Sequence, residues 1–280
     1  MVNKIGIIGL GKMGINIAHR LSNFYGPIYI TEKCAKKLDK NKKRFIPLEN
    51  PSKVSNSCDL LFICVNTVQE VDNILFSKNG VIVSKNKPKF IIDLSTIDPN
   101  FSEIFHKKLK KYKVSYIDSP MGRTPNHAKI GKLNLMMGCR KSDVKPIYKL
   151  LDHIAENIFF TNQIGMGNKI KLLNNFYGQS ITALFNDIIK IAHKKKINLK
   201  MFFRVINKGP LYSGILKDIY SYHTISKTKF MKFSLKNAYK DLKYFRNYYN
   251  KKNNFYLEYI IKRTKSKISK LKINKSVGEL

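Results

Sequence analysis

The first 32 residues carry the pattern that most constrains the fold of this chain. An apolar run over residues 5–8 leads directly into a six-residue turn that consists of Gly9, Leu10, Gly11, Lys12, Met13 and Gly14. Apolar residues at helical spacing follow at positions 17, 18 and 21. In this order of strand, turn and helix, Gly9 permits a tight turn, Gly11 lets the backbone approach a pyrophosphate, and Gly14 lets the helix pack on the strand. The unpaired N–H groups at the start of such a helix bind phosphate.

Glu32 indicates which ligand this turn binds. It ends the second apolar run, residues 28–31, and stands 23 positions after Gly9. At this spacing a carboxylate accepts hydrogen bonds from the adenosine ribose hydroxyls and repels the 2′-phosphate of NADP. The sequence therefore predicts that residues 9–14 and Glu32 bind NAD. NADP is the less favoured alternative, which Lys33 leaves open because a lysine there could tolerate a phosphate.

The two halves of the chain differ in periodicity. The first half alternates short apolar runs with amphipathic stretches, which predicts βαβ units and a parallel sheet. We expect strands at residues 4–8, 28–31, 60–65, 90–94 and 114–117, and a short one near 134–137. After Gly165 the pattern is that of long helices. The predicted architecture is an α/β Rossmann domain over residues 1–163, followed by an all-α substrate and oligomerisation domain over residues 164–280.

The net charge of +35 raises the question of a nucleic acid or anionic membrane partner. Seven of the 53 basic residues are arginine and 46 are lysine, and they are scattered among abundant Asn, Ile, Phe and Tyr. This mixture is typical of an AT-rich genome, so we favour codon bias over polyanion binding and expect no specific nucleic acid partner. No apolar stretch approaches the ~18 residues of a membrane span. The N-terminal residues run straight into the first strand, which predicts a cytoplasmic location.

The spacing of cysteine and histidine predicts no metal site. The four cysteines show neither CxxC nor metal-ligand spacing and are expected to be reduced structural thiols: Cys34, Cys58, Cys64 and Cys139. The six histidines do not cluster at ligand spacings either.

Four further motifs follow the glycine turn in order. Residues 93–99 read D-L-S-T-I-D-P, residues 118–125 read D-S-P-M-G-R-T-P, residues 165–175 read G-M-G-N-K-I-K-L-L-N-N, and residues 240–242 read K-D-L. Together they resemble the β-hydroxyacid dehydrogenase family, which includes 3-hydroxyisobutyrate dehydrogenase and, more distantly, 6-phosphogluconate dehydrogenase. The resemblance runs nearly end to end. It implies an NAD-dependent enzyme that acts on CH–OH donors and assembles as a dimer or tetramer through its helical half.

The resemblance also implies a role for residues in each motif. Lys171 is the implied catalytic acid, because an ammonium group can stabilise and protonate the alkoxide formed on reduction of an aldehyde. Asn175 lies four positions later, on the same helical face, and would orient the lysine or the substrate hydroxyl. The implied substrate-binding residues are Ser95, Gly122, Arg123, Thr124 and Asn174. Thr96 and Lys240 join the cofactor-binding set, with Lys240 closing the site from the helical domain.

The same helix carries an apolar stripe on a different face, which we expect to pack in the core. Its members are Ile170, Leu173, Tyr177, Ile181, Leu184 and Ile188.

Residues 122–124 depart from the family pattern, in which Ser-Gly-Gly stands at the place of Gly122-Arg123-Thr124. Arg123 offers a planar fork of donors to a carboxylate, sulfonate or phosphate, which predicts a small anionic substrate. The variant is most similar to the sulfolactaldehyde reductase branch. A 3-hydroxyisobutyrate dehydrogenase and a semialdehyde or glyoxylate reductase are alternatives, and so is a structural Arg123 that staples its loop to a neighbouring carboxylate. From another class, the chain could be a non-catalytic dinucleotide- or nucleic-acid-binding remnant.

Overall fold

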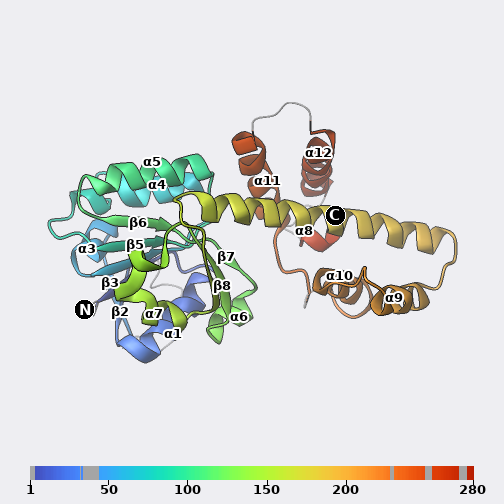
Figure 1. Cartoon of the computed structure of the whole chain (residues 1–280), viewed down its shortest axis with the longest axis horizontal. Coiled ribbons are helices and arrows are strands. Elements are labelled where there is room, and N and C mark those ends of the chain that lie inside the picture. The colour runs from blue at the N-terminus through green and yellow to red at the C-terminus, as the bar shows by residue number, and fades with distance from the viewer. Residues whose placement is uncertain (1–3, 32, 34–43, 228–229, 250–253, 271–275) are drawn as a thin grey trace. The chain divides into compact units, whose positions relative to one another are not determined.

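The computed structural model describes residues 4–31, 33, 44–227, 230–249, 254–270 and 276–280 (Figure 1). The chain forms two compact units, Met1–Lys171 and Leu172–Leu280. The division falls inside the long helix α8 (Met166–Lys194), later than the predicted boundary after residue 163. The prediction followed the change of periodicity, whereas the first turn of α8 is hydrogen-bonded to the sheet and so belongs to the first unit.

A six-stranded parallel sheet forms the centre of the first unit, in the order β3-β2-β1-β4-β5-β6. Its strands are β1 (Ile5–Ile8), β2 (Ile28–Thr31), β3 (Phe45–Leu48), β4 (Leu60–Ile63), β5 (Phe90–Asp93) and β6 (Ser115–Asp118). Every residue of β1 and β4 is buried, as expected of apolar strands that are covered on both faces. This strand order is that of the Rossmann fold, and the predicted fold class is confirmed.

Helices cover both faces of the sheet (Figure 1). Helices α4 (Val68–Phe76) and α5 (Pro99–Lys110) lie over one face, and α1 (Gly14–Tyr25) lies over the other. Local signals fix where they begin. Thr67 and Glu70 form a reciprocal capping box at α4, and Pro99 stands in the first turn of α5 behind the capping Asp98. The shorter helical elements are α3 (Pro51–Asn56), η2 (Val81–Val83), α6 (Pro125–Lys129), η3 (Lys141–Ile147) and α7 (Tyr148–Asp152).

A second sheet has three strands, β7 (Met121–Gly122), β8 (Leu133–Met137) and β9 (Ala155–Phe160). β7 pairs antiparallel with β8, and β8 pairs parallel with β9. The sequence predicted β8 but missed β3, β7 and β9. β3 and β9 are edge strands of mixed exposure, so they lack the continuous apolar run on which the strand predictions depended.

The second unit is built from helices, as predicted. After the remainder of α8 come α9 (Leu199–Lys208), α10 (Gly214–Thr224), α11 (Leu235–Tyr249), α12 (Phe255–Lys270) and the single turn η4 (Val277–Glu279). Its main core joins residues of α8, α11 and α12 to the last residues of the chain, with Leu172, Leu242, Ile260 and Leu280 at most 1% exposed.

The predicted inward face of α8 is wrong. Leu173, Tyr177 and Leu184 are 56%, 59% and 55% exposed, Ile170 is exposed as well, and Ile181 and Ile188 are only partly buried. The buried face carries three polar side chains among its apolar ones. Gln179, Thr182 and Asn186 donate to the carbonyl oxygens of Ala238, Gly178 and Gly278. Hydrophobicity selected the wrong face because these polar residues are buried with acceptors for their donor groups inside the unit.

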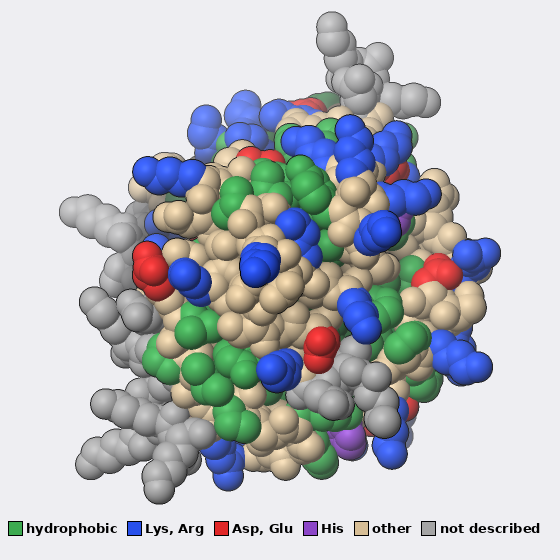
Figure 2. Space-filling model, turned by 90° about the vertical axis from the view of Figure 1, so that its left-hand side faces the viewer, with side chains coloured by type: hydrophobic (Ala, Val, Ile, Leu, Met, Phe, Trp, Pro, Cys, Tyr) green, Lys and Arg blue, Asp and Glu red, His purple; other side chains and the backbone are tan. Residues whose placement is uncertain are grey.

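The basic residues are spread over the face shown in Figure 2, where hydrophobic and other side chains lie between them. Among the described residues, no helix combines the length and the apolar character that crossing a membrane requires.

Candidate active site

The glycine turn joins β1 to α1 at the carboxyl edge of the large sheet. Gly9 has a φ of +101°, and a Cβ built there would lie 2.2 Å from the Cys64 carbonyl oxygen. A Cβ on Gly14 would lie 2.0 Å from the carbonyl oxygen of Gly9, whereas one on Gly11 would meet nothing within 4 Å. The turn is therefore packed against the protein at Gly9 and Gly14 and open at Gly11, which fits the three roles predicted for these glycines.

The start of α1 is suited to bind an anion. Its N-cap residue Met13 makes no side-chain capping hydrogen bond, and the first turn contains no acidic residue. The Ile15 and Asn16 N–H groups of this turn donate to the Gly11 and Met13 carbonyl oxygens, each at 3.1 Å, so the positive end of the helix dipole is what favours a phosphate group here. Lys12 is exposed beside this helix end, and the buried Leu10 anchors the turn. These residues fit the pyrophosphate of a dinucleotide. Glu32, the predicted partner of the ribose, lies outside the described residues.

Ser95 and Thr96 follow β5 at the same edge of the sheet. Asp93, which ends β5, is fully buried; its Oδ1 accepts the Ser95 N–H at 2.9 Å and its Oδ2 accepts the Tyr116 hydroxyl at 2.7 Å. Ser95 Oγ accepts the N–H of Val65 at 3.0 Å, and the Ser95 hydroxyl also donates to the Asp93 carboxylate. Burial raises the pKa of Asp93 to about 6, although the hydrogen bonds from Ser95 and Tyr116 oppose the shift.

Asp118 ends β6 and joins this edge to the start of α8. Its carboxylate is fully buried, with Oδ1 accepting the Gly165 N–H at 2.7 Å and Oδ2 accepting the Asn168 N–H at 2.9 Å. Burial raises the pKa of Asp118 to about 6 against the effect of these hydrogen bonds. The close approach of this helix start to the sheet requires glycine at both positions of the G-M-G block. Gly165 has a φ of +81°, and a Cβ on Gly167 would lie 2.1 Å from the Met136 carbonyl oxygen.

Lys171 is partly buried one turn beyond Gly167 on α8. Because α8 is continuous from Met166 to Lys194, Asn168, Lys171 and Asn175 lie on one helical face at positions i, i+3 and i+7. The face shared by Lys171 and Asn175 agrees with the sequence prediction. Asn174 lies next to this face and is exposed.

In the second unit, Asp241 of α11 brings two predicted site residues together. Its Oδ2 accepts the Asn175 Nδ2–H at 2.7 Å, and its Oδ1 lies 3.0 Å from Lys240 Nζ. The Asp241 side chain is 4% exposed. In the sequence, Asp241 stands out only as the middle residue of the K-D-L motif. An acidic residue directly beside a predicted site lysine was the signal that could have marked it.

Arg123 lies in the loop between the small β7 strand, which holds Gly122, and helix α6. It has a φ of +74°, in the left-handed region that favours the glycine of the family pattern. Its guanidinium pairs with Glu156 of β9 and donates from Nη1 to the Lys132 carbonyl oxygen at 3.0 Å. This arrangement agrees with the alternative in which Arg123 has a structural role and holds its loop to a neighbouring carboxylate. The neighbouring Thr124 precedes α6, with Oγ1 2.8 Å from His127 Nδ1. No sequence signal connects Arg123 with a glutamate 33 positions away.

The thiols have a structural role, and Cys64 packs beneath the glycine turn. Cys58, Cys64 and Cys139 are free thiols, and burial raises the pKa of each to about 12. Cys34 lies outside the described residues. No group of His, Cys, Asp and Glu side chains within the described ranges could hold a metal ion.

Residues 4–165 match the family model described as the NAD binding domain of 6-phosphogluconate dehydrogenase. The chain belongs to this family. The resemblance drawn from the motifs is therefore confirmed, and the cofactor of the first unit is a nicotinamide dinucleotide.

Relatives of this chain include dehydrogenases and reductases. It is 24% identical over 232 residues to the chloroplastic glyoxylate/succinic semialdehyde reductase 2 of Arabidopsis thaliana, which covers 77% of this chain and 63% of the relative. It is also 24% identical over 239 residues to the 3-sulfolactaldehyde reductase of Escherichia coli, covering 85% and 80%. The match thus spans less than two thirds of the plant relative. A solved 3-hydroxyisobutyrate dehydrogenase of Mycobacterium tuberculosis, with L-serine, shares the fold at a TM-score of 0.85 and 16% identity, covering 99% and 97%.

Proposed function

We propose that this chain is an NAD(H)-dependent oxidoreductase that interconverts a small anionic hydroxyacid or hydroxysulfonate and its aldehyde. The observation that carries the proposal is the position of Lys171. It follows a helix start that buried Asp118 and Asn168 tie to the carboxyl edge of the sheet, where the glycine turn, Ser95 and Thr96 also lie. A helix fixed in this way gives a lysine a defined position, which a general acid requires.

Lys171 is the proposed proton donor. The nicotinamide, when bound, supplies the hydride that reduces the aldehyde carbon. The Lys171 ammonium group donates a hydrogen bond to the aldehyde oxygen, stabilises the negative charge that grows there, and transfers a proton to it. In the oxidative direction the neutral amine accepts the hydroxyl proton.

Asn175 and Lys240 have supporting roles in this proposal. Asp241 accepts from the Asn175 amide nitrogen, so the amide has a fixed orientation and the Asn175 carbonyl oxygen is free to accept from the lysine or the substrate hydroxyl. The Lys240 ammonium group, held at 3.0 Å from the same carboxylate, adds positive charge for an anionic ligand. Ser95, Gly122, Thr124 and Asn174 are the remaining proposed substrate contacts.

NAD is the proposed cofactor rather than NADP, because Glu32 stands at the position where a carboxylate repels a 2′-phosphate. The matching test is the ratio of kcat/KM for NADH and NADPH in the wild type and in Glu32→Gln. We expect NADH to be preferred, and the preference to shrink in the variant. A preference for NADPH in the wild type would contradict the assignment.

The substrate is proposed to be 3-sulfolactaldehyde, with 3-hydroxyisobutyrate or a semialdehyde or glyoxylate as alternatives. The decisive experiment measures NADH and NADPH oxidation with 3-sulfolactaldehyde, succinate semialdehyde, methylmalonate semialdehyde, tartronate semialdehyde and glyoxylate. The highest kcat/KM is expected for the sulfonate. A higher value for a carboxylate would replace the substrate, and no oxidation with any of the five would contradict the activity. Salt-sensitive binding of DNA or RNA by such an inactive chain would favour the non-catalytic alternative.

Arg123 has two possible roles in this proposal, substrate binding and anchoring of its loop. If it binds the anionic end of the substrate, Arg123→Ala raises the substrate KM far more than the cofactor KM. If it only holds the loop, the two KM values change equally, because its contacts with Glu156 and Lys132 are structural. Glu156→Gln is the matched variant, since it removes the ion pair and leaves the guanidinium in place.

A homo-oligomer is also proposed. The support is the exposed apolar row of Leu173, Tyr177, Leu184 and Ile191 along α8, which is 55–59% exposed at each position. Light scattering on the wild type and on Leu184→Lys tests it: the wild type is expected to be a dimer or larger, and the variant to dissociate. A monomeric wild type would contradict the proposal.

A further inference from the structure

We infer that Asn168 is a positioning residue for Lys171. Its side chain acts on the chemistry through the lysine and is not expected to touch substrate or cofactor. The inference rests on the proposed function in one respect, namely that Lys171 is the proton donor.

Asn168 ties the first turn of α8 to three other segments of the first unit. Its side chain is fully buried, with Oδ1 accepting the Ile97 N–H at 3.1 Å and Nδ2 donating to Ser102 Oγ at 3.1 Å. Its backbone N–H donates to Asp118 Oδ2 at 2.9 Å. One residue thus holds the loop after β5, helix α5 and the end of β6 through three of its polar groups. An amide that is buried and hydrogen-bonded at both its oxygen and its nitrogen permits little rotation or sliding of the turn that carries it.

The same contacts determine where Lys171 lies relative to the loop after β5. Lys171 follows Asn168 by three residues on the same helical face, a rise of about 4.5 Å along the axis. The Ile97 N–H that Asn168 accepts comes directly after Ser95 and Thr96, the residues proposed to meet substrate and nicotinamide. A shift of the first turn of α8 would therefore move the Lys171 ammonium group relative to the substrate oxygen that it is proposed to protonate. Misplacement of a reacting group by about 1 Å costs on the order of 100-fold in rate.

A second contact between α8 and α5 lies close by but differs in character. Lys169 Nζ is 3.1 Å from Glu103 Oε1, and the two side chains are 17% and 40% exposed. An ion pair in which one partner is this open to solvent contributes little to stability and holds geometry loosely. Asn168, rather than the neighbouring lysine, is therefore the residue that fixes the helix.

Asn168→Ala tests the inference, with Asn157→Ala as the matched control. Asn157 is a partly buried amide that donates to Asn134 Oδ1 at 3.0 Å; it lies in the same unit as Asn168, but on the small sheet rather than on α8. We expect Asn168→Ala to lower kcat by about 10- to 100-fold while the KM for NADH stays within about twofold. Amide hydrogen exchange at Ile97 and at residues 166–171 should become faster. Asn157→Ala should leave kcat and these exchange rates unchanged.

Asn168→Asp serves as the conservative variant. In its protonated form it keeps an acceptor for the Ile97 N–H and a hydroxyl that can donate to Ser102 Oγ, so at a pH where this carboxyl is neutral it should retain more of kcat than Asn168→Ala. The activity measurements use whichever of the five aldehydes the wild type reduces fastest.

Two results would overturn the inference. One is a kcat for Asn168→Ala that equals that of Asn157→Ala, and the other is unchanged exchange at Ile97 and residues 166–171. A wild type that reduces none of the five aldehydes would refute the proposed function instead. In that case the exchange measurement still decides whether Asn168 holds the helix, because it needs no substrate.

Discussion

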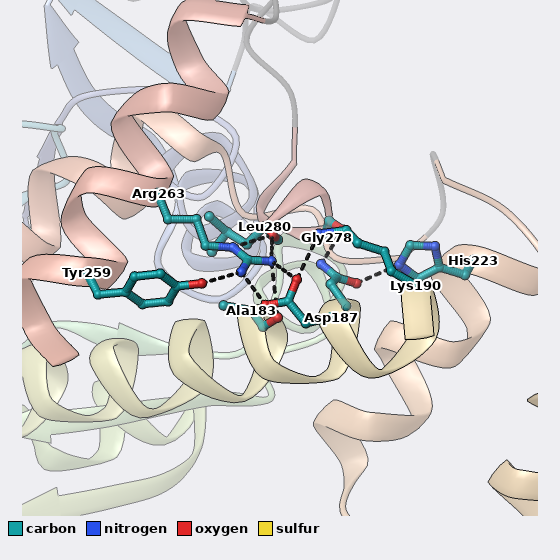
Figure 3. Close-up of polar contacts among 9 residues, drawn as sticks. Ala183, Asp187, Lys190, His223, Tyr259, Arg263, Gly278 and Leu280 are labelled. Carbon is teal, nitrogen blue, oxygen red and sulfur yellow. Dashed lines mark hydrogen bonds and ion pairs between the residues drawn. The ribbon is translucent and has the colours of Figure 1, made fainter. Parts of the chain in front are cut away.

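The two units hold distant segments together with opposite kinds of polar contact. In the first unit, the buried carboxylate of Asp118 binds backbone N–H groups at the start of α8. In the second, Arg263 of α12 donates from Nε to the Leu280 carbonyl oxygen at 2.7 Å and from Nη2 to Asp187 at 2.8 Å, and it also contacts Tyr259 and Ala183 (Figure 3). Asp187 itself is 40% exposed.

The difference appears in the pKa values of the acids. Burial dominates at Asp118 and Asp93 and raises the pKa of each to about 6. At Asp187 the hydrogen bond from Arg263 dominates and lowers the pKa to about 2. The contact beside the proposed site thus positions a helix at a cost in free energy at neutral pH, whereas the contact of the helical unit stabilises its fold at that pH.

The largest expected effect is that of removing the buried acid. Asp118→Ala leaves the Gly165 and Asn168 N–H groups without an acceptor, and we expect it to lower the free energy of unfolding by about 4 kcal/mol. Asp187→Ala removes a half-exposed pair and should cost about 1 kcal/mol. Urea unfolding followed by circular dichroism measures both. An equal decrease in the free energy of unfolding for the two variants would contradict the difference proposed between the two contacts.

The next effect is the dependence of stability on pH. Asp93 and Asp118 have folded pKa values above the unfolded ones, so the folded state binds more protons, and these two groups lower the free energy of unfolding as pH rises from about 4 through 6. Each shift corresponds to about 3 kcal/mol. Asp187 acts in the opposite direction: its contribution is present above about pH 4 and is lost as pH falls toward 2.

Asp93→Asn isolates this pH effect. The amide keeps an acceptor for the Ser95 N–H and can donate to the Tyr116 oxygen, so the contacts survive without a charge. The variant should reduce the fall in stability between pH 4 and 7, measured by urea unfolding at a series of pH values. A curve identical to that of the wild type would contradict the assignment of the slope to buried carboxyls.

A smaller effect is expected at Arg263. Arg263→Met removes the Arg263 donors to Asp187 and Leu280, while Lys190 still donates to Asp187 at 2.8 Å. The variant should cost about 2 kcal/mol, reduced from a fully buried pair because Asp187 is partly solvated. Hydrogen exchange at residues 276–280 should become faster. NADH affinity, measured by fluorescence titration, should not change, because the proposed dinucleotide site belongs to the first unit. A loss of NADH affinity would show that the contact is not confined to the helical unit. Arg263→Lys keeps the charge without the planar fork and should lie between the wild type and the methionine variant.

Sequence reasoning recovered what depends on local pattern. The buried apolar runs gave five of the six large-sheet strands, and the glycine turn has the packing predicted for Gly9, Gly11 and Gly14. It failed where polar side chains are buried and where strands are partly exposed. Gln179, Thr182 and Asn186 make the inner face of α8 look like an outer face, and edge strands β3 and β9 lack an apolar run.

The candidate site shows the same limit. The motifs named Lys171 and Asn175, but the residues that hold them, Asp118, Asn168 and Asp241, depend on contacts across 50 to 71 positions of sequence. The pairing of Arg123 with Glu156 likewise needs the register of the small sheet. Such contacts follow from the tertiary fold and leave no periodic signal in the chain.

The most direct test of the account is the turnover of Lys171→Ala, with Lys169→Ala as the control for loss of a lysine from the same turn. NADH binding is measured by fluorescence titration, and NADH oxidation with the fastest of the five aldehydes. The account predicts that Lys171→Ala keeps its NADH Kd within about twofold and loses on the order of 1,000-fold in kcat, while Lys169→Ala stays near the wild type. Near-normal turnover by Lys171→Ala would contradict it.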